Sequence, residues 1–186
     1  RRYYKALCEK RSKGTIKDDL SKLEILMKQA GITIADRKVA VEALKKEEAT
    51  DNKPATAIEL QDGTIVTGRT SDLLGASAAA LINALKSLAG IDDDVNLIAP
   101  EAIEPIQTLK TKYLGNKNPR LHTDEVLIAL SVSAASNPLA KKALEQLPNL
   151  AGCQAHTSVM VSSVDIKQLK RLSIQATYEA KYEKRD

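Results

Sequence analysis

The 186-residue sequence predicts an α/β protein with a mixed sheet, and three neighbouring patterns carry this prediction. Two short β-branched runs, 57–60 and 64–67, flank Asp62-Gly63, a dipeptide typical of a tight hairpin turn. An apolar stripe at helical spacing follows over 77–88 and ends at Gly90. The short apolar run 95–99 then predicts a further strand, so a hairpin, a crossover helix and a strand build one sheet.

The first 48 residues predict a helical arm. One helix runs to Gly14, and Thr15 is placed to cap the next. A third helix is expected to start near Thr33, with Asp36 as the partner in its capping box. The polar segment 49–54 ends in a proline and predicts a linker.

These patterns divide the chain into parts. We expect a helical arm over 1–48 that continues a longer chain, an α/β domain over 55–178, and a charged tail over 179–186 that frays. Thr123 is expected to be the N-cap of a helix whose first turn carries Asp124 and Glu125. We expect further helices at 102–114, 126–135, 138–147 and 163–172. A β-rich run is expected at 157–161 and a last strand at 173–178.

Composition excludes several classes of function. Hydrophobic residues make up 43% of the chain but aromatic residues only 3%, so the core must be aliphatic. The 28 basic and 24 acidic residues are interleaved, which is not the clustered basic surface of a nucleic-acid-binding protein. Cys8 and Cys153 form no disulfide framework, as expected of a reducing cytoplasm. The sequence has no apolar run of about 18 residues, so no membrane insertion is expected.

The order of elements resembles the cytidine-deaminase-like, three-layer fold. In that family a zinc ligand and the catalytic glutamate begin the helix after the hairpin, and Pro-Cys-x-x-Cys follows the next strand. The corresponding windows here read GASAA at 75–79 and PEAIE at 100–104. Zinc requires thiolate, imidazole or carboxylate ligands in tetrahedral array, and two glutamates alone make a poor site. The resemblance therefore implies the scaffold without the deaminase chemistry and without a metal.

Longer motifs resemble a second family. They are QDGTIVTGRTS at 61–71, EPI at 104–106, EVLIALS at 125–131, ASNP at 135–138 and GCQAH at 152–156. On these runs the chain is similar to the C-terminal portion of the bacterial family called domain of unknown function 1846. The resemblance implies a longer protein whose N-terminal part carries a Gly-rich segment like a phosphate-cradling loop. That N-terminal region is therefore an expected partner of this chain.

One group of candidate residues suits an anion. Arg69, Thr70 and Ser71 offer a guanidinium and two hydroxyls just before a helix, an arrangement that suits a small phosphate-bearing ligand. Ordinary capping by the hydroxyls, with a surface arginine, is the simpler interpretation of the same residues.

A second group suits metal or thiol chemistry. Cys153 and His156 have the spacing of half a metal site, with His122 as a third ligand if the loops meet. The same residues suit a cysteine nucleophile and a histidine base, and Glu125 is a further catalytic candidate. We favour the structural alternative, a buried cysteine on a strand beside a hydrogen-bonded histidine.

Three functions remain open at this stage. The first is the C-terminal domain of a cytoplasmic nucleotide- or phosphate-handling enzyme, which contributes Arg69, Thr70, Ser71 and His122, with His156 as a further candidate, across an interface with the N-terminal region. The second is an inactive deaminase-like module for binding or homo-oligomerisation. The third is a zinc-dependent hydrolase with ligands from Cys153, His156 and His122. The sequence identifies neither a substrate nor a cofactor.

Overall fold

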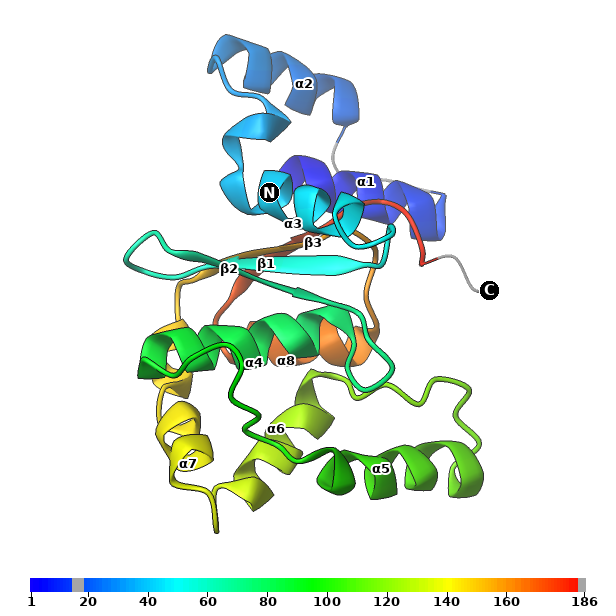
Figure 1. Cartoon of the computed structure of the whole chain (residues 1–186). Helices are drawn as coiled ribbons and strands as arrows, with labels where there is room; N and C mark the ends of the chain where they lie inside the picture. Colours follow the sequence, from blue (N-terminus) through cyan, green and yellow to red (C-terminus); the bar gives the residue numbers. More distant parts are fainter. Residues whose placement is uncertain (15–18, 184–186) are drawn as a thin grey trace.

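A computed structural model of the chain, which describes residues 1–14 and 19–183, shows a four-stranded sheet between layers of helices (Figure 1). The strands are β1 (Ala55–Glu59), β2 (Ile65–Arg69), β3 (Gln154–Thr157) and β4 (Gln175–Tyr178), in the spatial order β2-β1-β3-β4. β1 is antiparallel to both β2 and β3, whereas β3 and β4 are parallel. The expected α/β class with a mixed sheet is confirmed.

Helices cover both faces of the sheet (Figure 1). One face carries α1 (Arg2–Lys13), α2 (Leu20–Gln29), the short turn η1 (Ile34–Asp36) and α3 (Lys38–Glu48). The other face carries α4 (Ala76–Ala89) and α8 (Ser163–Arg171). Beneath them lie α5 (Pro100–Thr108), η2 (Leu109–Tyr113), α6 (Thr123–Ser133), α7 (Pro138–Leu144) and η3 (Leu147–Leu150). Across residues 1–14 and 19–183, none of these helices has the length and apolar character that a membrane crossing requires.

The hairpin forms as its turn residues predict. The Asp62 carboxylate accepts a hydrogen bond from the Thr64 amide at 2.9 Å, and Gly63 adopts a φ of 85°. A positive φ costs glycine little because it has no Cβ. The turn therefore sets the register in which Ala57 lies opposite Thr67.

The capping box in the arm also forms, but on a shorter element. Asp36 Oδ2 accepts from the Thr33 backbone amide at 2.6 Å, and the enclosed turn is η1 rather than the start of a long helix. The helix proper begins at Lys38. Thr15, the expected cap of α2, lies outside the described residues, and Asp19 caps α2 by accepting from the Ser21 amide.

Arg37 ties this end of the chain to the sheet. Its guanidinium donates to Thr177 Oγ1, to Gln154 Oε1 and to the backbone carbonyls of Ala155 and Gln175, at 2.8 to 3.0 Å. These four acceptors belong to β3 and β4, so α3 is fixed across the sheet directly after residue 37. The division of the chain at the 49–54 linker stays a prediction.

The expected strand at 95–99 is wrong. This segment is irregular, and Leu97 and Ile98 pack into the main core. Burial among helices explains an apolar run as well as strand pairing does, so the pattern alone could not decide. The element between α4 and α5 on which the deaminase-like order depended is therefore a loop. The β-rich run expected at 157–161 is also shifted, because the strand ends at Thr157.

The tail from residue 179 to 183 does not fray as expected. The Glu179 amide donates to the Thr157 carbonyl, and the Met160 amide donates to the Lys181 carbonyl at 2.8 Å. Lys181 Nζ lies 2.7 Å from Glu47 Oε2, and this glutamate is only 8% exposed. The tail thus closes over the end of β3 and touches α3.

The core is aliphatic, as the composition predicts. Its largest fully buried side chains include Ile58, Leu81, Leu85, Leu121 and Leu130. They fill the space between the sheet and the helices beneath it. This packing positions the first turns of α4, α6 and α8, which matter for the site described next.

Candidate functional site

Polar side chains gather at the end of the sheet where β2, β3 and β4 terminate, near the starts of α4 and α8. Four residues lie in register across this end, Gly68, Thr56, Thr157 and Tyr178, one from each strand. Thr56 Oγ1 lies 2.9 Å from Thr157 Oγ1 and 3.4 Å from Ser77 Oγ in α4. This row of hydroxyls therefore faces α4 and α8.

The three predicted anion-binding residues lie where β2 ends: Arg69 is its last residue, and Thr70 and Ser71 begin the loop after it. Ser71 Oγ accepts from the backbone amides of Leu73 and Leu74, at 3.3 and 3.1 Å, which caps a tight turn. Thr70 is buried, and its amide donates to the Pro54 carbonyl. The Arg69 side chain is exposed, with one long hydrogen bond of 3.4 Å to the Thr70 carbonyl. The loop geometry thus comes from capping, and the guanidinium remains accessible.

A single backbone bridge places this loop beside the segment that leads to His122. Leu74 and Leu121 form an isolated parallel bridge, in which the Leu121 amide donates to the Leu73 carbonyl at 2.9 Å. The Gly75 amide in turn donates to the Leu121 carbonyl at 3.1 Å. The structure therefore brings the turn that begins at Ser71 next to Leu121, the residue before His122, although the two segments are about fifty positions apart in sequence.

His122 is held by a buried carboxylate. Its Nδ1 lies 2.9 Å from Asp165 Oδ2. Asp165 Oδ2 also accepts from Ser162 Oγ at 2.7 Å, and Asp165 Oδ1 accepts from the Thr123 amide at 2.9 Å. The Asp165 side chain is 9% exposed and that of His122 22% exposed. A histidine whose ring orientation is fixed by a buried carboxylate is a recurrent arrangement in proton-transfer and metal sites.

The two groups shift each other's titration in opposite directions. The hydrogen bond to Asp165 raises the pKa of His122 above its ordinary value, although burial opposes this. Burial alone would raise the pKa of Asp165, but the hydrogen bonds from His122, the Thr123 amide and Ser162 outweigh it and hold that pKa low. Tyr178 lies close enough for the Asp165 charge to add to burial in raising the pKa of its phenol.

Glu125 has a capping role, and the expected N-cap is corrected. His122, not Thr123, is the N-cap of α6, because Glu125 Oε2 accepts from the His122 amide at 2.7 Å. The same oxygen pairs at 2.7 Å with Nζ of Lys110, a lysine only 4% exposed. The carboxylate that sequence suggested as catalytic is thus committed to a cap and an ion pair beside His122.

Cys153 and His156 do not meet. Cys153 lies in the main core at 2% exposure, whereas His156 is fully buried in β3 and packs edge-on against the Tyr4 ring of α1. His156 Nδ1 is hydrogen-bonded to Thr177 Oγ1 at 2.8 Å, and Nε2 lies 3.2 Å from Glu179 Oε1 without the alignment of a hydrogen bond. Within residues 1–14 and 19–183, no group of three His, Cys, Asp or Glu side chains is arranged to hold a metal ion.

Sequence reasoning missed Asp165, Ser162 and Tyr178. The pattern Ser162-x-x-Asp165 is a recognisable helix start, and the Asp165 amide does donate to Ser162 Oγ. Its second role was invisible, because Asp165 meets a histidine 43 residues earlier in the chain.

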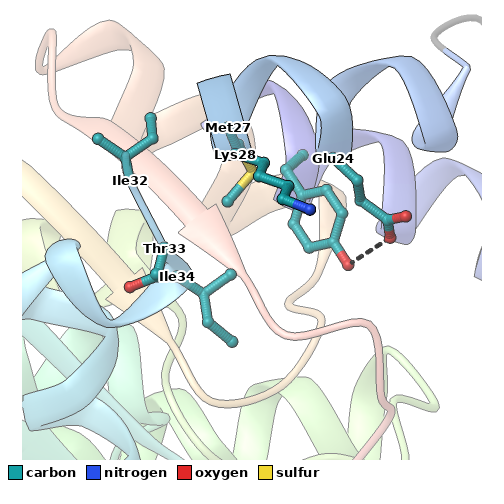
Figure 2. A pocket seen from close by; sticks show the side chains of 7 residues that line it. Glu24, Met27, Lys28, Ile32, Thr33 and Ile34 are labelled. Atoms are coloured by element: carbon teal, nitrogen blue, oxygen red, sulfur yellow. Dashed lines mark hydrogen bonds between the residues drawn. The ribbon is translucent and has the colours of Figure 1, made fainter. Parts of the chain in front are cut away.

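Two hollows of the surface lie away from the candidate site. A mostly apolar pocket of about 340 Å³ lies at the arm (Figure 2), lined by Tyr3, Glu24, Met27, Lys28, Ile32, Thr33 and Ile34. A polar groove of about 630 Å³ runs along β2, from Thr64 to Thr67, and is bordered by Lys46 and Asp92. Neither hollow is lined by His122 or Arg69, so the candidate site is defined by the chemistry of its side chains and not by a cavity.

The fold and the site define an α/β domain with a carboxylate-held histidine, and the residue before this histidine is bridged to the turn that follows β2. The chain belongs to the family whose model is described as "Domain of unknown function DUF1846, C-terminal", which matches residues 35–186. It is 54% identical to a UPF0371 protein of Corynebacterium urealyticum over 98% of the chain, and 46% identical to one of Streptococcus pneumoniae over 98%. The chain spans 36% and 37% of the length of these two relatives.

Proposed function

We propose that this chain is the C-terminal domain of a cytoplasmic enzyme that handles nucleotides or other phosphate-bearing small molecules. The observation that carries the proposal is the Leu74–Leu121 bridge, which pairs the turn after Arg69, Thr70 and Ser71 with the residue before His122. A guanidinium and a polarised imidazole on adjoining loops suit a phosphate group and a reacting atom next to it.

Three features support an anion at this place. Arg69 is exposed, and its one long hydrogen bond leaves most of its donors available. Ser71 Oγ accepts two amide bonds, so its own proton is free to donate. The first turn of α4 begins a few residues later, where the helix dipole favours negative charge.

The rest of the protein is the proposed partner. The chain covers little more than a third of its relatives, so we propose that the N-terminal region completes the site. The interleaved charges do not favour a nucleic acid. The deaminase-like scaffold depended on the element order expected from the sequence, and the strand at 95–99 in that order does not form.

Ligand-induced thermal stabilisation tests the proposal. A ligand at ~100 times its dissociation constant stabilises a protein by about 2.7 kcal/mol, and each ~1 kcal/mol moves the melting midpoint by roughly 2 to 4 °C at this size. We expect inorganic phosphate or a nucleotide to raise the midpoint of this chain or of a full-length relative. Arg69→Ala should remove the shift from the chain.

Arg171→Ala is the matched control, since Arg171 is an exposed arginine in the last turn of α8, away from the site. It should keep the full response. A phosphate response that survives in Arg69→Ala would contradict the proposed site.

A second function, a binding or homo-oligomerisation module, is favoured by exposed apolar side chains on the outer helices. These side chains, each at least half exposed, are Leu109, Tyr113, Leu114, Ile128 and Val132. Such a surface marks an interface in many proteins. Light scattering tests it: a dimer that Ile128→Asp converts to monomer would support it. The zinc-hydrolase alternative gains no support, because Cys153 and His156 lie in separate environments.

A further inference from the structure

We propose that His122 is the proton-transferring group of this site, held by Asp165 and Ser162 as the tautomer with a proton on Nδ1 and a free lone pair on Nε2. The inference deepens the proposed function and rests on it for the ligand. It names the class of reaction: one in which a hydroxyl, a water or a phosphate oxygen at the ligand loses or gains a proton. Asp165 and Ser162 are positioning residues.

The hydrogen bonds around Asp165 determine the tautomer. Ser162 Oγ donates to Asp165 Oδ2, and the Thr123 amide donates to Oδ1. The carboxylate is ionised, so it can only accept, and the contact of 2.9 Å to His122 Nδ1 requires the proton on Nδ1. The neutral ring then carries its lone pair on Nε2.

Nε2 is left available for chemistry. Within the described part of the chain no hydrogen bond to His122 Nε2 is formed, and Nε2 is not one of the buried side-chain atoms that lack a partner. A ring that is 22% exposed with one nitrogen fixed and the other free can accept a proton from a ligand.

Among the charged groups around the His122 ring, Asp165 has the largest effect on the pKa of the imidazole. The charge of Lys110, in η2, lowers the pKa of His122, and the charge of Glu125, in α6, raises it. These two side chains form an ion pair with each other at 2.7 Å. From β4, the Tyr178 phenol faces Asp165 and stays protonated. Asp165 is therefore the charge that offsets an imidazolium here.

The proton step balances without any further reagent. Nε2 takes the proton from the hydroxyl or water, and the new imidazolium keeps its other proton on Nδ1, in the hydrogen bond to Asp165. The same proton is returned from Nε2 to a leaving or product oxygen. His156, the other of the two histidines, cannot do this, because it is fully buried and bonded to Thr177.

Nitrogen-15 NMR of the imidazole rings tests the inference on the intact chain. Only two histidines contribute, and His122→Gln assigns the signals. We expect His122 above its titration midpoint to show a protonated Nδ1 and an unprotonated Nε2, with a midpoint above the ordinary 6.5. Asp165→Asn should lower the midpoint, whereas Ser162→Ala should leave it above 6.5, because the bond from His122 to Asp165 remains.

Asp124→Asn is the matched control. Asp124 is an acidic residue in the first turn of α6, directly after His122 and Thr123, but its Oδ1 accepts from the Glu125 amide and not from the His122 ring. It should leave the tautomer unchanged. Diethyl pyrocarbonate, which acylates an unprotonated ring nitrogen, should modify His122 and spare His156, with a rate that follows the NMR midpoint.

The outcomes separate this inference from the proposed function. A protonated Nε2 on neutral His122, or no acylation of His122, would overturn the inference whatever binds. Adding inorganic phosphate should then shift the His122 signals in the wild type but not in Arg69→Ala. The expected tautomer without any phosphate response would leave the inference on His122 standing and count against the proposed function.

Discussion

Gly68 of β2 lies directly against the backbone of Ala80 in α4: a Cβ built on Gly68 would stand 2.1 Å from the Ala80 nitrogen. No real Cβ tolerates such a distance, and the neighbour is backbone, which cannot rotate away. α4 is therefore as close to β2 as a helix can lie. This contact fixes the helix over the sheet and, with it, the turn that follows Arg69.

We expect Gly68→Ala to lower the free energy of unfolding by about 3 kcal/mol or more, because α4 must move off the sheet. Urea unfolding measures this. Gly75→Ala is the matched control: its Cβ would meet only the Leu121 carbonyl at 3.6 Å, an ordinary contact. As an N-cap change it should cost about 1 kcal/mol or less. Equal losses in the two variants would contradict the close packing.

Arg37→Ala should destabilise the chain by about 3 kcal/mol, because four acceptors on β3 and β4 lose a charged donor together. Arg37→Lys should recover less than half, since an ammonium group cannot reproduce the planar fork. Chemical unfolding is again the measurement, and the exposed Arg171→Ala should stay within about 0.5 kcal/mol of the wild type. A lysine variant as stable as the wild type would show that charge alone matters at Arg37.

Local patterns predicted local structure well. The Asp62-Gly63 turn, the helix ending at Gly90 and the Thr33–Asp36 box each depend on neighbours within four residues, and each forms. The strand predicted at 95–99 was wrong, because a buried loop and a buried strand can have the same apolar sequence.

The candidate site shows the same limit more sharply. Residues three positions apart share a face in a helix but lie on opposite faces of a strand, so the spacing of Cys153 and His156 separates them here. His122 and Asp165 are 43 residues apart and meet only because α6 packs on α8. The His122–Asp165 pair is therefore formed by tertiary packing, and no local sequence pattern could predict it.

Both cysteines should resist thiol reagents in the native state. Burial, helped by Glu179, raises the pKa of Cys8 from 9.0 to about 11, which lowers its thiolate fraction about a hundredfold. Burial also raises the pKa of Cys153, and its side chain is in the core. We expect slow labelling by a disulfide reagent at pH 7.5 and rapid labelling of two thiols in urea. Cys8→Ala isolates Cys153, and fast native labelling of that variant would favour thiol catalysis instead.

The His122–Asp165 pair should give stability a defined pH dependence. The folded-state pKa of His122 is raised, so its contribution is complete below the ordinary 6.5 and is lost as the pH rises through the folded-state value. The pKa of Asp165 is lowered, so its contribution is present above the ordinary 3.8 and is lost as the pH falls through the folded-state value.

The free-energy difference between the wild type and Asp165→Asn should therefore be largest between these two ordinary values, at about 3 kcal/mol near pH 5. It should shrink above the His122 midpoint, where Asp165 still accepts hydrogen bonds from the neutral imidazole, the Thr123 amide and Ser162 but no longer faces an imidazolium. Urea unfolding from pH 4 to 9 measures it, with Asp124→Asn as the control. A difference that stays constant across this range would mean that His122 does not become an imidazolium opposite Asp165.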